Sequence, residues 1–189
     1  MFGDTPAPDA PIAPSHAAAA PKTGRVIWIT GLSGAGKTAV ATILKELLEL
    51  RGDRTIVLDG DELRAALPLG NHFDRASRLA LAQTYGRLCL LLANQSFTVI
   101  CATISMHKEV YAWNRQYLPN YFEVYLDTPP QIRAQRDPKG YYAALGRGDV
   151  REFCGHDQSV DLPTSSDVHI QPKPDQSAQE ITAHILSYL

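Results

Sequence analysis

GLSGAGKT, at residues 31–38, fits the pattern G-x-x-x-x-G-K-[ST] of a phosphate-binding loop. The residues just before it, 25–30, are mostly apolar, which indicates a buried strand. After it, apolar residues recur at positions 40, 43, 44, 47 and 48, the spacing of an amphipathic helix. The loop therefore has the strand–loop–helix setting in which a helix N-terminus binds a phosphate group.

The residue types of this loop suit a nucleotide. Glycine permits positive φ and close approach of the backbone, so N–H groups can converge on phosphate oxygens. Lys37 can reach the β- and γ-phosphates of ATP, and the Thr38 hydroxyl can ligate Mg²⁺. The alternative is a glycine-rich turn with a surface lysine, but a lysine in a helix's first turn opposes the macrodipole unless an anion is bound. We expect ATP and Mg²⁺ as cofactors, with the nucleotide held by Gly31, Ser33, Gly34, Ala35, Gly36, Lys37 and Thr38.

The composition bounds the class of protein. A chain of 189 residues with 44% hydrophobic residues suits one domain with a real core. A net charge of −2 gives no reason to expect nucleic-acid or membrane binding, and no apolar run reaches the roughly 18 residues of a membrane span. Three cysteines follow no metal-binding spacing, which favours buried free thiols in a reducing cytoplasm.

The composition predicts a flexible Ala/Pro-rich tail over 1–24 and a P-loop nucleotide-binding domain over 25–189. Strand patterns alternate with helical ones, which predicts an α/β three-layer sandwich with a central parallel sheet of about five strands. Strands are expected at 25–30, 55–58, 97–102, 121–126 and 167–170. Helices are expected after the loop, near 63–67, over 73–95 (with Leu81, Tyr85, Leu88 and Leu92 on one face), over 108–117 and over 178–189. Pro129-Pro130 is interpreted as a break, and residues 136–163 as a mobile lid.

Several further motifs resemble one family. The chain is similar to the adenylylsulfate kinases over roughly residues 25–170, and the P-loop itself is the least specific part of that resemblance. The other matching stretches are LDGDELR at 58–64, Ile104-Ser105, YFEV at 121–124, RDPKGYY at 136–142 and EFCG at 152–155. This resemblance implies an enzyme that transfers the ATP γ-phosphoryl group to the 3′-hydroxyl of adenosine 5′-phosphosulfate, a small nucleotide, in sulfate assimilation. It also suggests a homodimer.

The resemblance assigns roles where residues match. Asp61 would be the general base or, with Thr38, the Mg²⁺ ligand, supported by Asp59; it could instead cap the next helix. Lys37 and the lid residue Lys139 would complete the catalytic set, and Arg136 would contact ATP. The acceptor would be bound by two arginines, two stacking phenylalanines, a serine and the lid lysine: Arg64, Arg78, Phe73, Phe153, Ser105 and Lys139.

The acceptor half departs from the family pattern. The asparagine that helps to read the acceptor nucleotide is Leu81 here, and Pro-Tyr-Arg after Ile-Ser is Met106-His107-Lys108. The TISM stretch at 103–106 and Trp113-Asn114-Arg115 resemble a divergent branch that phosphorylates cytidine diphosphoramidate for bacterial capsule polysaccharide. Two alternatives to sulfate activation therefore stay open: this branch activity, and a non-catalytic nucleotide-binding subunit.

Overall fold

The structure, a computed structural model, describes residues 24–67, 74–136 and 160–189. Its centre is a sheet of five parallel strands in the order β2-β3-β1-β4-β5. The strands are β1 (Arg25–Thr30), β2 (Thr55–Asp59), β3 (Thr98–Thr103), β4 (Tyr121–Leu126) and β5 (Val168–Ile170). The predicted α/β fold with a parallel sheet is confirmed, while the predicted tail and lid lie largely outside the described residues.

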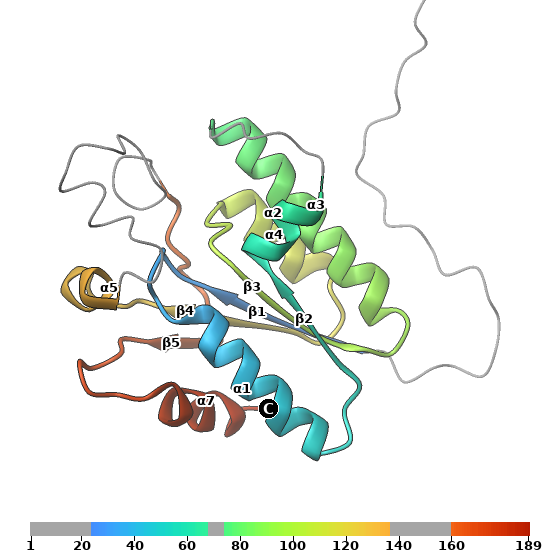
Figure 1. Cartoon of the computed structure of the whole chain (residues 1–189). Coiled ribbons are helices and arrows are strands. Elements are labelled where there is room, and N and C mark those ends of the chain that lie inside the picture. The colour runs from blue at the N-terminus through green and yellow to red at the C-terminus, as the bar shows by residue number, and fades with distance from the viewer. Residues whose placement is uncertain (1–23, 68–73, 137–159) are drawn as a thin grey trace, which may run out of the picture.

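Helices cover both faces of the sheet, as Figure 1 shows. The helices α1 (Lys37–Leu50) and α7 (Ala178–Leu186) pack on one face, against Ile27, Ile100 and Val124. On the other face α3 (Arg75–Ala93) and α4 (Lys108–Tyr117) pack against residues such as Trp28 and Cys101. Successive residues of a strand point to opposite faces, so the continuous apolar runs of β1 and β3 supply both cores.

The buried face of α3 differs from the predicted one. Tyr85 is buried as expected, but the residues beside it in the core are small: Ala82, Gly86, Cys89 and Ala93. They allow a close approach to α4, because a Cβ at Gly86 would lie 2.9 Å from Asn114 Oδ1. The predicted leucines Leu81, Leu88 and Leu92 are only half-buried. Because apolar residues lie on nearly all sides of α3, their spacing in the sequence does not show which side faces the core.

Two cysteines bear out the prediction of buried free thiols. Cys89 of α3 and Cys101 of β3 are both free and have no exposed surface. Burial raises the pKa of the Cys101 thiol well above its ordinary value, so it stays protonated. Cys154 lies outside the described residues.

In the described part of the chain, no helix is long and apolar enough to cross a membrane.

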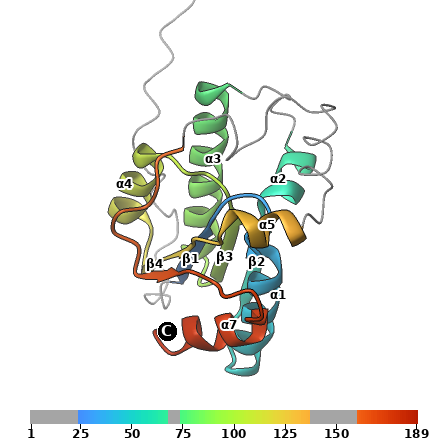
Figure 2. The same ribbon diagram turned by 90° about the vertical axis from the view of Figure 1, so that its left-hand side faces the viewer.

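One helix was not predicted. α5 (Pro130–Arg136) begins where the two prolines suggested only a break. Pro130 is its first residue, a position that proline favours because the first N–H of a helix has no intrahelical partner. Figure 2 looks onto the carboxyl ends of the strands and shows α5 there, in front of the sheet, with α2 (Gly60–Ala66) to one side. Ligands of such sheets bind at this edge.

Candidate active site

The P-loop connects β1 to α1 with a backbone that only glycine adopts easily. Gly36 is the N-cap residue of α1 and has φ of 96°, in the left-handed region. A Cβ at Gly31 would lie 2.6 Å from the carbonyl oxygen of Leu126, so only glycine fits between the loop and β4. The loop is thus held against the sheet with the N-terminus of α1 open to an anion.

Lys37 is folded back over this loop. Its Nζ donates hydrogen bonds to the carbonyl oxygens of Gly31 at 2.8 Å and Leu32 at 3.0 Å. The first turn of α1 contains no acidic residue that could offset the helix dipole. A polyphosphate at this position would have the lysine ammonium, the helix N-terminus and the loop N–H groups around it, so the residues present fit ATP.

Asp59 connects the P-loop to the next helix. It is buried at the end of β2, and its Oδ2 accepts a hydrogen bond of 2.7 Å from the Thr38 hydroxyl. Its Oδ1 accepts one of 2.8 Å from the Asp61 N–H, which makes Asp59 the N-cap of α2. The interpretation of Asp61 as the cap is therefore wrong; the cap lies two residues earlier, and the Asp61 carboxylate is free of that role.

The same contacts suit Mg²⁺. Because the Thr38 hydroxyl gives its hydrogen to Asp59, the lone pairs of Thr38 Oγ1 remain available to a cation. Thr38 is exposed, the Asp61 side chain is 45% exposed, and an oxygen-only donor set of this kind is what Mg²⁺ prefers. The residues present fit the ion, with Asp59 orienting Thr38.

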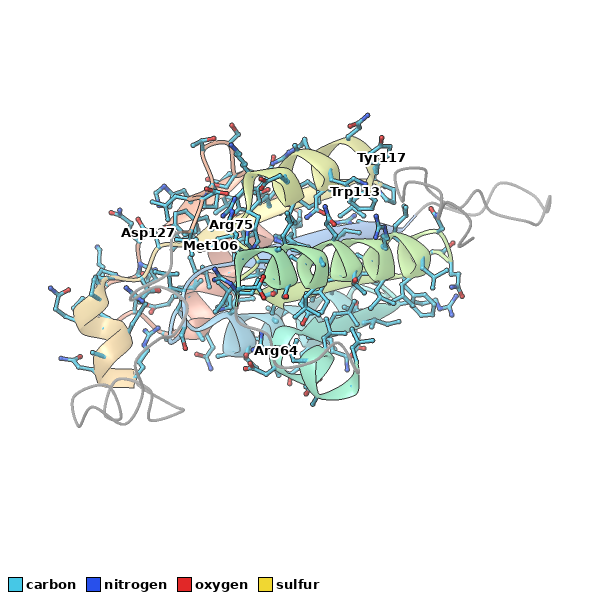
Figure 3. The ribbon with its side chains drawn as sticks, turned by 90° about the horizontal axis from the view of Figure 1, so that it is seen from above. Arg64, Arg75, Met106, Trp113, Tyr117 and Asp127 are labelled. Atoms are coloured by element: carbon cyan, nitrogen blue, oxygen red, sulfur yellow. The ribbon has the colours of Figure 1, made fainter. Side chains whose placement is uncertain are left out.

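Three of the side chains predicted to bind the acceptor lie in the described part of the chain: Arg64, Arg78 and Ser105. Arg64, one turn further along α2, forms an ion pair with the Asp61 carboxylate. Ser105 follows β3 with φ of 33°, and its hydroxyl lies 2.8 Å from Thr103 Oγ1. Arg78 lies half-buried near the start of α3. Figure 3 shows the start of α3 at Arg75 beside Met106, with Arg64 on α2 to one side.

Gly60 brings α2 close to β3. A Cβ at Gly60 would lie 3.0 Å from Thr103 Oγ1, and its carbonyl oxygen accepts a hydrogen bond of 3.3 Å from the Tyr85 hydroxyl. Burial raises the pKa of Tyr85 to about 12, so the hydroxyl keeps the proton that it donates. These contacts fix the start of α2, and with it Asp61, over the end of β3.

The prediction missed two residues that hold the P-loop from outside. Thr128 is buried and donates a hydrogen bond of 3.0 Å to the carbonyl oxygen of Ala35, and the Arg133 Nε donates one of 3.0 Å to Thr128. Gly34 packs on α5, since a Cβ there would lie 3.0 Å from the Arg133 carbonyl oxygen. Pro130 at a helix start was the signal for this element.

Of the remaining predicted site residues, Arg136 is described and three others are not. Arg136 ends α5, and its Nη1 would lie 3.2 Å from a Cβ built on Gly36. It therefore lies beside the P-loop, while its predicted contact with ATP stays a prediction. Phe73, Lys139 and Phe153 lie outside the described residues.

Comparison with known proteins agrees with this geometry. A sequence model described as adenylylsulphate kinase matches residues 23–171. The chain is 39% identical over 139 residues to cytidine diphosphoramidate kinase of Campylobacter jejuni, covering 73% of this chain and 81% of that protein. It is 36% identical over 166 residues to adenylyl-sulfate kinase of Vibrio cholerae, covering 87% and 77%.

A solved structure gives the same result. The Mycobacterium tuberculosis APS kinase CysC, in complex with AMPPNP and APS, matches with a TM-score of 0.80 at 34% identity, covering 88% of this chain and 98% of that one. The resemblance inferred from the motifs is confirmed. The chain belongs to the adenylylsulphate kinase family and is a phosphotransferase that acts on a hydroxyl acceptor.

Proposed function

We propose that this enzyme transfers the γ-phosphoryl group of ATP to the 3′-hydroxyl of a small nucleotide. The observation that carries the proposal is the chain of contacts from Thr38 through Asp59 to Asp61. These contacts connect the P-loop to the backbone of Asp61, which supports a role for its half-exposed carboxylate in orienting the acceptor hydroxyl toward the γ-phosphate.

On the donor side, the protein positions the phosphates of ATP and supplies positive charge to them. The P-loop N–H groups and the N-terminus of α1 bind the phosphates, and Lys37 exchanges its loop carbonyls for phosphate oxygens. Thr38 would hold Mg²⁺, together with Asp61 in the alternative to its role as base, and the ion would supply positive charge beside the phosphates. Arg136 at the end of α5 contacts the nucleotide.

On the acceptor side, Asp61 orients the sugar hydroxyl and takes its proton as the new P–O bond forms. Arg64 and Arg78 bind the anionic groups of the acceptor through their guanidinium groups. Arg64 must then leave its ion pair with Asp61, which frees that carboxylate for the hydroxyl. Phe73, Phe153, Ser105 and Lys139 complete the proposed acceptor site.

Two acceptors are candidates. Adenosine 5′-phosphosulfate is the default of the family, cytidine diphosphoramidate is the alternative, and one specific observation weakens the case for the phosphosulfate. Leu81, where the family has an asparagine, packs half-buried against the apolar cluster that contains Tyr85. Leucine cannot hydrogen-bond, so a polar base edge beside it would stay unpaired at a cost of about 1–3 kcal/mol, or roughly 5- to 150-fold in affinity.

The direct test supplies each nucleotide at equal concentration and measures ADP release and product mass. A high rate with the phosphosulfate would assign the enzyme to sulfate assimilation. A high rate only with the cytidine compound would assign it to modification of surface polysaccharide. ATP binding with no product from either nucleotide would favour the non-catalytic nucleotide-binding subunit and contradict the proposal.

A pair of variants sharpens the choice. Leu81→Asn restores the family residue and should lower the KM for adenosine 5′-phosphosulfate if Leu81 causes the discrimination. Leu79→Asn is the matched control, since Leu79 is also half-buried on α3 and packs against the same cluster. Equal responses of the two variants would show that Leu81 does not cause the discrimination.

The surroundings of the enzyme are part of the same proposal. We expect a homodimer, as the family resemblance suggests, and light scattering of the purified protein tests it. The free thiols of Cys89 and Cys101 suit a reducing cytoplasm. The division into a tail over 1–24 and a kinase domain over 25–189 remains a prediction, which limited proteolysis can check.

A further inference from the structure

Asp161 connects two segments that are distant from it and from each other in the sequence. Its N–H donates to the Met106 carbonyl oxygen at 3.0 Å, and its Oδ2 accepts from the Lys108 N–H at 3.1 Å. The same Oδ2 accepts a hydrogen bond of 2.9 Å from Arg75 Nη2, and its carbonyl oxygen accepts one of 3.1 Å from the Tyr111 hydroxyl. Figure 3 shows Arg75 and Met106 adjacent at the start of α3.

These contacts supply a helix cap from another part of the chain. The N-cap residue of α4, His107, makes no side-chain cap hydrogen bond. Asp161 replaces it, placing a carboxylate at the positive end of the helix. Because Asp161 holds residue 106 by its carbonyl and residue 108 by its N–H, the peptide between them is fixed on both sides.

Arg75 extends the arrangement to α3. Its guanidinium lies 2.9 Å from Asp161 Oδ2 and 3.4 Å from the carboxylate of Glu109. The positive charge of Arg75 therefore lies between these two carboxylates. The hydrogen bond from Arg75, then the one from the Lys108 N–H, holds the pKa of Asp161 below its ordinary value. Both side chains are partly exposed, so the pair adds little to overall stability and acts mainly on geometry.

The two segments that Asp161 connects carry proposed acceptor residues. Arg78 lies one turn after Arg75 on α3, and Ser105 lies just before Met106 in a left-handed conformation that its surroundings must maintain. We infer that Asp161 is a positioning residue for the acceptor: through Arg75 and the 106–108 backbone it holds Arg78 and Ser105 in one fixed arrangement. The inference rests on the proposed function of these two residues.

The test compares Asp161→Ala with Asp167→Ala. Asp167 is a matched control because its Oδ2 also accepts from an arginine, Arg115 at 2.8 Å, and from a backbone N–H, that of Glu123 at 2.7 Å. Asp161→Ala should raise the KM for the nucleotide acceptor about 10-fold or more and leave the KM for ATP unchanged. Asp167→Ala should change neither, and Asp161→Asn, which keeps an oxygen for Lys108, should fall between.

Two results would overturn the inference. One is an equal effect of Asp161→Ala and Asp167→Ala on acceptor KM; the other is an Asp161→Ala effect that is the same for ATP as for the acceptor. Amide hydrogen exchange gives a readout independent of activity. It should accelerate at residues 105–111 in Asp161→Ala but not in Asp167→Ala. Unchanged exchange in Asp161→Ala would contradict the inference that Asp161 fixes the 106–108 backbone. Wild-type protein that phosphorylates no nucleotide would defeat the proposed function, while the exchange experiment would still decide the role of Asp161.

Discussion

The donor and acceptor ends of this site are built in different ways. The P-loop lysine bonds a carbonyl six residues earlier, and the Asp59 cap bonds an N–H two residues later. The acceptor end depends on pairs such as Arg75–Asp161, 86 residues apart, and Lys108–Asp161, 53 residues apart. The contacts of the P-loop lysine and of the Asp59 cap are local, although Thr128 supports the loop from 93 residues away, whereas the contacts of Asp161 join distant segments. Acceptor preference can therefore change while the donor motif stays the same.

The largest effect is expected at the donor end. Lys37→Ala removes the ammonium from the transferring phosphoryl group and should lower kcat/KM about 10³–10⁵-fold, the range for a cation acting there. Circular dichroism should remain that of the wild type, because the core does not contain this side chain. Lys45→Ala is the control, since Lys45 lies on the same helix in an exposed pair with Glu49. Near-normal turnover of folded Lys37→Ala would reject the donor site.

Asp61→Asn tests the residue that we propose lies between the ATP site and the acceptor site. The variant should still bind ATP but lose about 10²–10⁴-fold in kcat, the usual contribution of a positioned base. Glu62→Gln, an exposed neighbour on α2, should leave kcat unchanged. A loss of only a few-fold in Asp61→Asn would transfer the role of base to Asp59, whose carboxylate is already bonded to Thr38.

A smaller effect is expected from the support outside the P-loop. Thr128→Val removes the hydrogen bond to Ala35 and should cost about 1 kcal/mol of unfolding free energy and raise the KM for ATP. Thr182→Val is the matched control: its buried hydroxyl bonds the Ala178 carbonyl oxygen at 2.7 Å on α7, away from the site. Urea unfolding should give similar losses, and ATP KM should change only in Thr128→Val.

The smallest effect concerns pH at the acceptor end. Burial, then the charges of Arg75 and Arg78, lower the pKa of His107 below its ordinary 6.5, although Glu109 and Asp161 oppose this. The unfolded chain therefore takes up a proton near pH 6.5 that the folded protein resists, and the unfolding free energy falls as pH drops below that value.

His107→Gln should reduce this fall. Urea unfolding at pH 7.5 and 5.5 measures it, and wild type and variant should respond alike between pH 7.5 and 8.5, above both pKa values of His107. An equal loss in the two proteins on acidification would contradict a neutral buried imidazole.

The same contrast explains how far sequence could predict the structure. The P-loop and the Asp59-Gly60-Asp61 stretch could be recognised from local pattern, because the residues that interact there are close in sequence. The parallel sheet could be predicted from the alternation of strand and helix patterns, although its strands pair residues far apart in sequence, such as Arg25 and Thr98. The buried face of α3 could not be predicted, because most of its leucines are only half-buried while the fully buried residues beside Tyr85 are small. Neither could the contacts of Asp161, because no local pattern relates residue 161 to residues 75 and 108. α5 was predictable in principle from Pro130.

The position of Lys37 also has a consequence for turnover. Its ammonium donates hydrogen bonds to the Gly31 and Leu32 carbonyl oxygens. Nucleotide binding is therefore an exchange of partners rather than a simple gain, and two existing hydrogen bonds of about 1 kcal/mol each offset part of the new attraction. When ADP departs, the lysine returns to partners that are already in place. We expect this return to lower the barrier to product release, so the loop shortens the lifetime of its own product complex.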